Sequence, residues 1–417
     1  MKDLPQGWRE VALNHVVSVS KETGIPSEKP EYPFVGMEHV ASQTGEIVEY
    51  GNSADYKSGA VIADDALVLY GRLRPYLNKV FIPKSKCFAS GEFIPLRVGP
   101  DLDKRYLLHL LRSANFVTFA VSLNAGDRPR VKWEQMGNFP LALPPLAEQE
   151  RIVEILEEQF SRLDSALASV KAVREKTKAF RRSLLHSAFS GELTGGTEGW
   201  QTVNIDSLLG NLPNGKKVGQ GWSPQCESVP ASEGEWGVLK TTAIQAGRFE
   251  PEHNKRLPAT LEPREAIEIQ VGDLLMTCAG PRVRCGVPCL VRKTPQKLMM
   301  SGKMYRFRPD TKQVVPEYLE AYLLAPTTQS AINLLKTGIS ESGLNLTHAR
   351  FFTLEVPKPP LATQERIVSL LEEQFSRLDK ALEVANQLEA RIASERRSLL
   401  HSAFTGALTA TWRQNND

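Results

Sequence analysis

The chain has 417 residues, of which 41% are hydrophobic and 24% charged, so it is long enough for more than one globular domain. No uninterrupted apolar stretch of about 18 residues occurs, the first residues lack the apolar core of a signal peptide, and the five cysteines form no paired framework. These features exclude a membrane-spanning or disulfide-stapled protein, and we expect a cytoplasmic one. The net charge of +3 does not by itself indicate a nucleic-acid partner.

The first globular segment covers residues 1–143. Short β-like runs broken by Gly and Pro, followed by one short helix, predict a mixed α+β domain. In chain order the landmarks are Gly7-Trp8, the stretch 32–40, the apolar run after Asp65, Ser90-Gly91 and a helix around 106–111.

Basic residues gather in two places of this segment. Between Asp65 and Glu92 the chain has no acidic residue. A second basic stretch, 126–133, comes just before the next element. Clustered Lys and Arg suit phosphate contacts, and Arg also reads guanine. For one window alone, a solvated basic face is the simpler interpretation. The candidate DNA contacts here are Arg72, Arg74, Lys79, Arg128, Arg130 and Lys132.

A long helix is expected next, over residues 144–194, and the chain repeats it. The segment aligns without a gap to residues 359–409, with 32 of 51 positions identical. The middle, 168–180 against 383–395, has diverged completely but has kept its length. Tolerance of substitution without insertion is typical of a helix whose register is fixed.

Both copies carry apolar residues at alternating steps of four and three, as in a coiled-coil seam. Proline pairs precede each copy, and Gly191 and Gly406 are suitable ends. We predict that the two helices, each about 40 residues or roughly 60 Å long, pair within the chain as an antiparallel coiled coil with pseudo-twofold symmetry. The alternative is that each helix packs on its own domain. The seam is predicted at Ile152, Leu156, Leu163, Val170, Ile367, Leu371, Leu378 and Leu388.

The second globular segment, residues 195–358, repeats the landmarks of the first and is predicted to be a distant version of the same fold. It also repeats the acid-free window, between Asp273 and Asp310. Its loop before the helix, 341–348, is polar instead of basic. Two matched windows favour DNA over an ordinary solvated face. The candidate contacts are Lys240, Arg282, Arg284, Arg292 and Lys303.

The repeated blocks PPLA-x-QERIV, LEEQFSRLD and RRSLLHSAF, with the segments LVLYGRLRPYLNKV and VLKTTAIQAG, resemble the specificity subunits of Type I restriction-modification enzymes. The order of the segments matches that family too. The resemblance implies two target-recognition domains (1–143 and 195–358), two helical spacers (144–194 and 359–409) and a C-terminal tail (410–417).

In such enzymes each recognition domain reads one half of a split double-stranded DNA site. The helices set the spacing and dock two modification subunits, which use S-adenosylmethionine. Restriction subunits, which use ATP and magnesium, join that core. For this chain we expect partner docking at the identical ends of the helix copies, at Arg181, Arg182, Phe189, Arg396, Arg397 and Phe404.

No catalytic constellation emerges from the sequence. The stretch 210–217 lacks the Ser or Thr of a phosphate loop, because Lys217 stands in that place. The cysteines at 278, 285 and 289 lack the paired spacing of a zinc site. We therefore expect no catalytic residue, no metal and no cofactor in this chain. The competing hypotheses are a protein–protein scaffold that does not contact DNA and a standalone enzyme.

Overall fold

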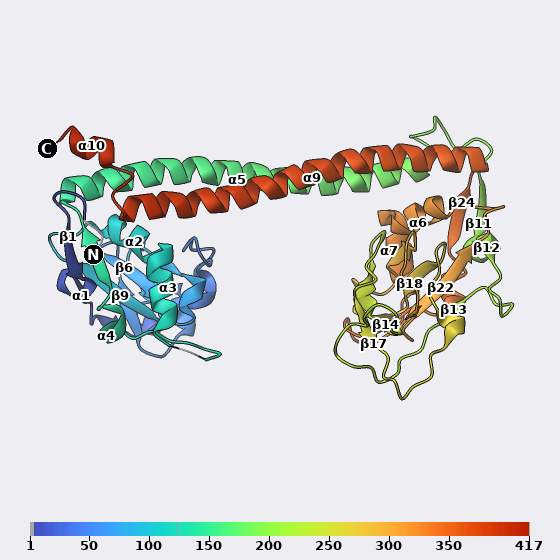
Figure 1. Cartoon of the computed structure of the whole chain (residues 1–417), viewed down its shortest axis with the longest axis horizontal. Helices are drawn as coiled ribbons and strands as arrows, with labels where there is room; N and C mark the ends of the chain where they lie inside the picture. Colours follow the sequence, from blue (N-terminus) through green and yellow to red (C-terminus); the bar gives the residue numbers. More distant parts are fainter. Residues whose placement is uncertain (1–3, 125, 417) are drawn as a thin grey trace. The chain divides into compact units, whose positions relative to one another are not determined.

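The computed structural model describes residues 4–124 and 126–416 and divides into two compact units (Figure 1). Unit 1 comprises Met1–Lys171 and Ala385–Asp417, and unit 2 comprises Ala172–Val384. Each unit therefore joins one globular segment to half of each long helix. The boundary between the two units falls in the middle of each long helix, not at the ends of the repeated segments.

The two long helices are present where the sequence predicts them. Helix α5 (Leu146–Phe189) and helix α9 (Leu361–Phe404) have 44 residues each, about 66 Å at 1.5 Å per residue. Each begins directly after its proline pair. Each ends two residues before a glycine with positive φ, Gly191 at 86° and Gly406 at 76°. None of the helices in the described part of the chain is long and apolar enough to cross a membrane.

Unit 1 contains two four-stranded sheets and one two-stranded sheet. The sheet orders are β2-β9-β6-β7, β3-β5-β8-β4 and β1-β10. The strands are β1 (Arg9–Ala12), β2 (Val17–Val19), β3 (Thr23–Gly24), β4 (Phe34–Val35), β5 (Ala60–Ala63), β6 (Leu67–Gly71), β7 (Val80–Phe81), β8 (Cys87–Ala89), β9 (Phe93–Val98) and β10 (Pro140–Leu143). The short helices are α1 (Leu13–Val16), α2 (Lys104–Leu111), α3 (Ala114–Ser122) and α4 (Trp133–Met136), with α10 (Ala410–Gln414) at the C-terminal end.

Strand β6 lies between two hydrophobic cores. Its alternate side chains point to opposite faces, as strand geometry requires. Val68 and Tyr70 belong to the core that includes helix α2 and the first turns of α5. Leu67 and Leu69 belong to the second core, with Phe81 from β7. All five residues of the strand are buried, which explains its uninterrupted apolar run.

Unit 2 is built in the same way, from smaller strands. Its main sheet has the order β12-β22-β18-β20, with β13 also on β22, and β17-β14-β21 form a second sheet. The strands are β11 (Gln201–Asn204), β12 (Leu209–Gly210), β13 (Gly219–Gln220), β14 (Gly237–Leu239), β15 (Ile244–Gln245), β16 (Arg248–Phe249), β17 (Asn254–Arg256), β18 (Leu274–Thr277), β19 (Ala279–Gly280), β20 (Pro288–Leu290), β21 (Leu298–Met299), β22 (Met304–Pro309), β23 (Leu344–Asn345) and β24 (Glu355–Lys358). The helices are α6 (Pro316–Leu324), α7 (Pro326–Leu335) and α8 (His348–Phe351).

Strand β18 has the role in unit 2 that β6 has in unit 1. Leu274 and Met276 pack in the core that contains α6 and the first turns of α9, whereas Leu275 belongs to the other core. The mixed α+β architecture predicted for both segments is therefore confirmed.

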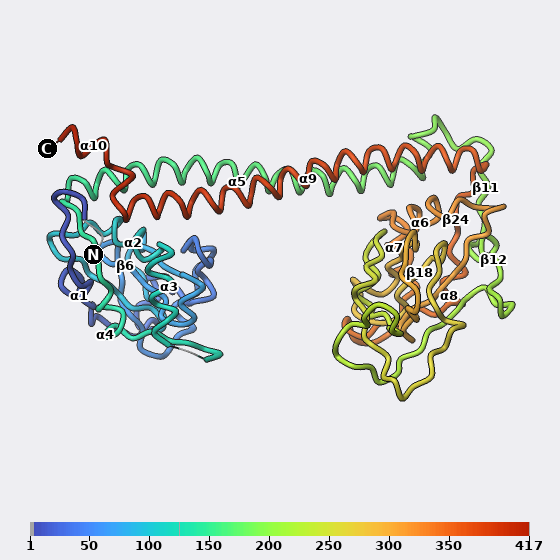
Figure 2. Tube along the Cα trace, in the orientation of Figure 1, coloured from blue at the N-terminus to red at the C-terminus, as the bar shows by residue number. Residues whose placement is uncertain are grey.

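Within each unit the two long helices run antiparallel and make the same contacts. In unit 1 the end of α9 lies beside the start of α5 (Figure 2), and Arg396 pairs with Asp164 and lies 5.1 Å from the centre of the Phe160 ring. In unit 2 Arg181 pairs with Asp379 and lies over the equivalent phenylalanine ring, at 4.8 Å. The blocks LEEQFSRLD and RRSLLHSAF thus contact each other, which gives their identity a structural reason.

The predicted seam is buried unevenly. Ile152 and Leu156 are fully buried in the core of unit 1, as are their counterparts in unit 2, so the first turns of each helix pack on a globular segment. Farther along α5, Leu163 is half-buried and Val170 is buried. In α9, Leu388 is 40% exposed. The coiled-coil and domain-packing interpretations therefore describe different stretches of the same helices.

A buried glutamine fixes the start of each long helix. The Gln149 Nε2 donates to the Pro144 carbonyl at 2.8 Å, and the Gln364 Nε2 donates to the Pro359 carbonyl at 2.8 Å. Both glutamines are 0% exposed. A buried amide of this kind is stable only when its hydrogen bonds are made, so the motif PPLA-x-Q has a direct structural role.

Candidate DNA interface

The two basic stretches predicted in the first segment meet in unit 1. One is the turn after β6, residues 72–78, and the other is the loop before α4, residues 126–132. They are joined by a bridge between Leu73 and Arg130 and by hydrogen bonds from Arg74 N to Pro129 O at 2.8 Å and from Val131 N to Arg72 O at 3.0 Å. The two stretches therefore form one surface, which we call loop pair 1.

The backbone of the first turn is strained. Arg74 has φ of 52° and Asn78 has φ of 47°, in the left-handed region on either side of a short 3-10 turn. For a residue with a side chain, this region costs about 1–2 kcal/mol. The pairing with the second loop and a hydrogen bond from Asn78 Nδ2 to Arg112 O at 3.3 Å hold the turn in place. Tyr76, at its centre, is 45% exposed.

The basic side chains of loop pair 1 differ in their surroundings. Arg128 and Lys132 are exposed, and within residues 4–124 and 126–416 their side chains have no hydrogen-bond or ion-pair partner. Arg130 makes a two-pronged contact with Glu92, at 3.2 and 2.7 Å. Lys79 is half-buried and donates to the Met37 carbonyl at 2.6 Å. Arg72 and Arg74 are also half-buried.

Unit 2 has the same arrangement at the equivalent place. Strand β19 pairs with β23, and Leu346 N donates to the Cys278 carbonyl at 2.9 Å. Gly280, with φ of 140°, pairs with Leu344. The second strand of this pair lies before α8, as the second strand of loop pair 1 lies before α4. We call this surface, residues 278–284 and 338–347, loop pair 2.

Loop pair 2 carries a different set of side chains. Arg282 makes two hydrogen bonds with Glu341, at 2.7 and 2.8 Å, and both side chains remain exposed. These hydrogen bonds hold the pKa of Glu341 below its usual value and raise the pKa of Arg282. Val283 is 83% exposed, and Arg284 turns inward to the Ile244 carbonyl at 3.2 Å.

The remaining predicted contacts of the second segment lie elsewhere in unit 2. Lys303 is exposed and follows β21, and Lys240 is half-buried after β14. Arg292 follows β20 and pairs with Glu320 of α6 at 2.6 Å. The structure therefore brings only Arg282 and Arg284 of this set into the loop pair.

Several residues of the loop pairs were not found from the sequence. The acidic partners Glu92 and Glu341 lie outside the basic windows or in another loop, so sequence neighbours could not identify them. Gln43 donates from its backbone N and its side chain to the turn of loop pair 1, both at 2.9 Å. Gln43 has a φ of 68°, and nothing in the sequence indicates this left-handed conformation. Arg350, exposed on α8, adds a basic group beside loop pair 2.

The predicted partner-docking residues divide into two groups. Phe189 packs against Tyr318 with ring centres 5.3 Å apart, and Phe404 packs against Tyr106 at 5.2 Å. Arg181 and Arg396 are engaged between the helices, as described above. Arg182 and Arg397, by contrast, are exposed. Of the predicted set, these two arginines are the ones whose side chains lie most openly on the surface.

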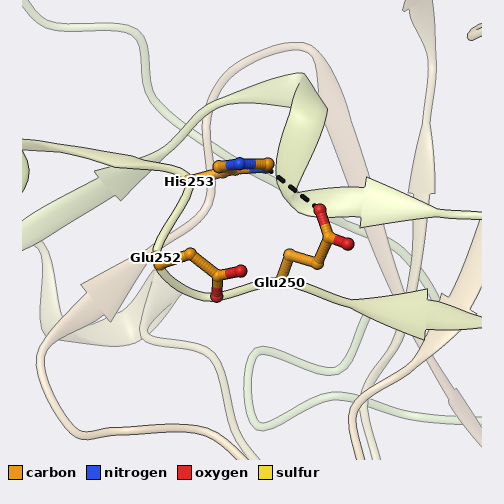
Figure 3. A group of neighbouring side chains, drawn as sticks. All are labelled: Glu250, Glu252 and His253. Atoms are coloured by element: carbon orange, nitrogen blue, oxygen red, sulfur yellow. Dashed lines mark ion pairs between the residues drawn. The ribbon is translucent and has the colours of Figure 1, made fainter. Parts of the chain in front are cut away.

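One group of potential metal ligands occurs among the described residues, and it is not the cysteine set considered from the sequence. Glu250, Glu252 and His253 place one ligand atom each within 4.8 Å of one another (Figure 3). Glu250 already pairs with Arg248 and, at 3.2 Å, with the His253 Nδ1. That nitrogen also lies 3.0 Å from the Thr242 carbonyl. These contacts explain why the three side chains lie together, because they stabilise the turn between β16 and β17.

Comparison with known proteins gives a consistent result. Residues 5–169 match the model of the Type I restriction modification DNA specificity domain. The chain is 28% identical to the Type I restriction enzyme EcoKI specificity subunit of Escherichia coli, over 99% of this chain and 92% of that protein. It is 24% identical to the EcoEI specificity subunit of Escherichia coli, over 96% of this chain and 82% of that protein.

Solved structures share the fold. A chain from work on the assembly and conformational transition of the type I R-M system superposes with a TM-score of 0.75 at 20% identity, covering 98% of this chain and all of that one. The HsdS subunit from Thermoanaerobacter tengcongensis gives 0.53 at 21% identity, covering 97% and 98%. These structures share the arrangement of two α+β segments with two long helices. Over nearly its whole length the chain is similar to the specificity subunits of Type I restriction-modification enzymes.

Proposed function

We propose that this chain recognises a bipartite double-stranded DNA site, with loop pair 1 reading one half-site and loop pair 2 the other. The observation that carries this proposal is the recurrence of one backbone arrangement with different exposed side chains. Loop pair 1 presents Arg128, Lys132 and Tyr76, whereas loop pair 2 presents Val283 and the Arg282–Glu341 pair. Base edges are read by such side chains, and the backbone beneath them sets their position.

The recognition domains are residues 1–143 and 195–358, and the helical segments 144–194 and 359–409 set the spacing between half-sites. A lengthened helix pair tests this role. Four residues inserted after Val173, with four more at the equivalent position after Leu388, should change the unspecified spacer and leave both half-sites as they are. An unchanged spacer in a folded variant would contradict the proposal.

The helices also dock two modification subunits, one on each unit. The exposed residues that are identical in the two helix copies include three pairs near the helix ends that take part neither in the helix–helix contact nor in a hydrophobic core. These pairs are Arg182 and Arg397, His186 and His401, and Ser183 and Ser398. Identical exposed residues at equivalent positions suit two copies of one partner. Loss of one modification subunit from an Arg182→Glu variant would support this assignment.

The chain contributes recognition, and its partners contribute the chemistry. The specificity subunits to which it is similar are not themselves the methyl-transferring or cleaving component. The modification subunits would supply S-adenosylmethionine-dependent adenine methylation, and restriction subunits would supply ATP- and magnesium-dependent translocation and cleavage. Methyl transfer by the isolated chain would contradict this division.

The direct test is sequence selection by the assembled complex. The chain, purified with its modification subunits, is incubated with a randomised duplex library at moderate salt, because phosphate contacts alone dominate at low salt. We expect two short defined segments separated by a fixed, unspecified spacer. Equal binding of all duplexes would overturn the proposal.

A further inference from the structure

Unit 2 contains a cavity of about 300 Å³ beside helix α6, where α6 faces the half-helices of α5 and α9 that belong to this unit. Its floor is apolar and is formed by Leu185, Leu324, Leu371 and Phe375. The rim is charged. A cavity with an apolar floor and a few polar groups is the usual form of a binding pocket in a folded domain.

The corresponding place in unit 1 is occupied by the chain itself. Helix α2 has His109 and Arg112 where α6 has Ala321 and Leu324. The His109 ring packs edge-on against Phe160, with centres 5.5 Å apart. Arg112 reaches past it and donates to the Val80 carbonyl at 2.7 Å. Two larger side chains thus stand in unit 1 where unit 2 has the cavity.

The lining of the cavity has more acidic than basic side chains, with Glu317, Glu320 and Glu372 against Arg181 and Arg292. Arg292 pairs with Glu320 at 2.6 Å, and Arg181 pairs with Asp379. Glu317 and Glu372 also line the cavity. Throughout residues 4–124 and 126–416, neither of these two carboxylates has a hydrogen-bond or ion-pair partner. Both carboxylates interact electrostatically with Arg292, which is hydrogen-bonded to Glu320. The cavity therefore combines an apolar floor with an excess of acid, because one arginine serves three glutamates.

We propose that this cavity receives a basic side chain from the modification subunit docked on unit 2. The proposal rests on the docking proposed above. The alkyl part of a Lys or Arg would cover the floor, as such side chains commonly do on apolar surfaces. Its charged end would meet Glu317 and Glu372. In unit 1 the larger side chains of His109 and Arg112 stand at the corresponding positions, so the two copies of the partner bind through different contacts.

Two variants of the full chain test the cavity. In Glu317→Gln/Glu372→Gln the shape stays and the charge is lost. In Ala321→His/Leu324→Arg the residues of unit 1 are transferred into unit 2 and fill the space. The matched control is Glu373→Gln, the neighbour of Glu372, whose carboxylate pairs at the surface with Arg377. Thermal unfolding of each variant confirms that it is folded.

Stepwise binding of purified modification subunit is measured by calorimetry, with complexes counted by native mass spectrometry. We expect both variants to weaken one of the two binding steps at least tenfold and to leave the other unchanged, with the control like the wild type. Wild-type binding of both copies by the charge variant would overturn the cavity proposal and leave the docking proposal standing. Equal weakening of both steps would also overturn it.

Two further results would identify other occupants and reject the proposal. If the variants change self-association of the chain and not partner binding, the occupant is a second copy. If the wild-type chain binds no modification subunit at all, the docking proposal fails and the cavity proposal fails with it.

Discussion

The two units have the same architecture, but the end of a long helix is attached to the globular segment in different ways. In unit 2, helix α5 ends at Phe189, and residues 190–200 connect it directly to β11 of the globular segment. The connection is therefore covalent. In unit 1, the end of α9 is held by a buried polar cluster around Glu148, which is 2% exposed. Glu148 accepts hydrogen bonds from Trp8 Nε1 at 2.9 Å, Thr409 Oγ1 at 2.6 Å and Arg413 Nη2 at 2.8 Å.

This difference shows why one position departs from the repeat. Thr363 is the residue equivalent to Glu148, and Glu198 is equivalent to Arg413. In unit 2, where α5 leads directly into the globular segment, no ion pair is needed at this junction. Thr363 is uncharged, so it could not form an ion pair with Glu198. In unit 1, α9 comes long after the globular segment in the sequence, and the same junction is held by a buried carboxylate and three donors. Each prediction below breaks or sharpens this comparison.

The largest effect should come from the Glu148 cluster. Removing one partner of a buried ion pair leaves an uncompensated charge and costs about 3–5 kcal/mol. Arg413→Ala should therefore lower the free energy of unfolding of unit 1 by that amount, measured by urea denaturation with hydrogen exchange. The matched control is Glu198→Ala in unit 2, where the side chain is exposed and the expected change is within about 0.5 kcal/mol. Equal losses in the two variants would refute the comparison.

The second effect concerns pH. Burial, with the nearby arginines, lowers the pKa of His109 to about 3. The unfolded chain takes up a proton near pH 6.5 and the folded one does not, so stability is complete above about pH 6.5 and falls as the pH drops towards 3. The loss is about 2 kcal/mol at pH 5, at 1.36 kcal/mol per pH unit. Unit 2 has Ala321 in this position and lacks the contribution.

The pH effect is isolated by a single substitution. His109→Phe keeps an aromatic ring against Phe160 and removes the titrating group. The difference in unfolding free energy between this variant and the wild type should change between pH 7 and pH 5. A pH-independent difference would show that His109 titrates normally.

The sequence predicted the scaffold well, and it predicted the surroundings of the basic residues only in part. Both long helices and their ends followed from local rules, because periodicity and capping act over a few residues. Their antiparallel pairing was predicted from the repeated apolar seam, which needs a partner. The acid-free windows were less informative. Arg130 and Arg282 are neutralised by Glu92 and Glu341, and Arg292 by Glu320. Partners that come from distant segments cannot be counted along the sequence.

The third effect distinguishes the arginines of loop pair 1. Arg128 is exposed without a partner among the residues described, whereas Arg130 is paired with Glu92. Arg128→Ala should weaken binding to the specific duplex about tenfold and reduce the salt dependence by about one unit of slope. Arg130→Ala should have a smaller effect, since its contact with DNA would require breaking an ion pair. Lys84→Ala, on another turn, should bind like the wild type.

The smallest effect tests what the units share. Arg181 and Arg396 make equivalent ion pairs and lie over equivalent phenylalanines. Their side chains are 34% and 27% exposed. Replacing either by Ala should cost about 1 kcal/mol, the usual scale of partly exposed pairs. Melting temperatures that fall equally would confirm that the helix contacts are equivalent. Unequal losses would show that the repeat hides a structural difference.

The central claim is that each unit reads one half of a divided site. The most direct measurement is the mapping of methylated adenines in cells that carry the chain with its partner subunits. The wild type should give one bipartite motif, and replacing residues 126–132 of loop pair 1 should alter one half of it. A contiguous motif, or a change in both halves, would contradict the claim.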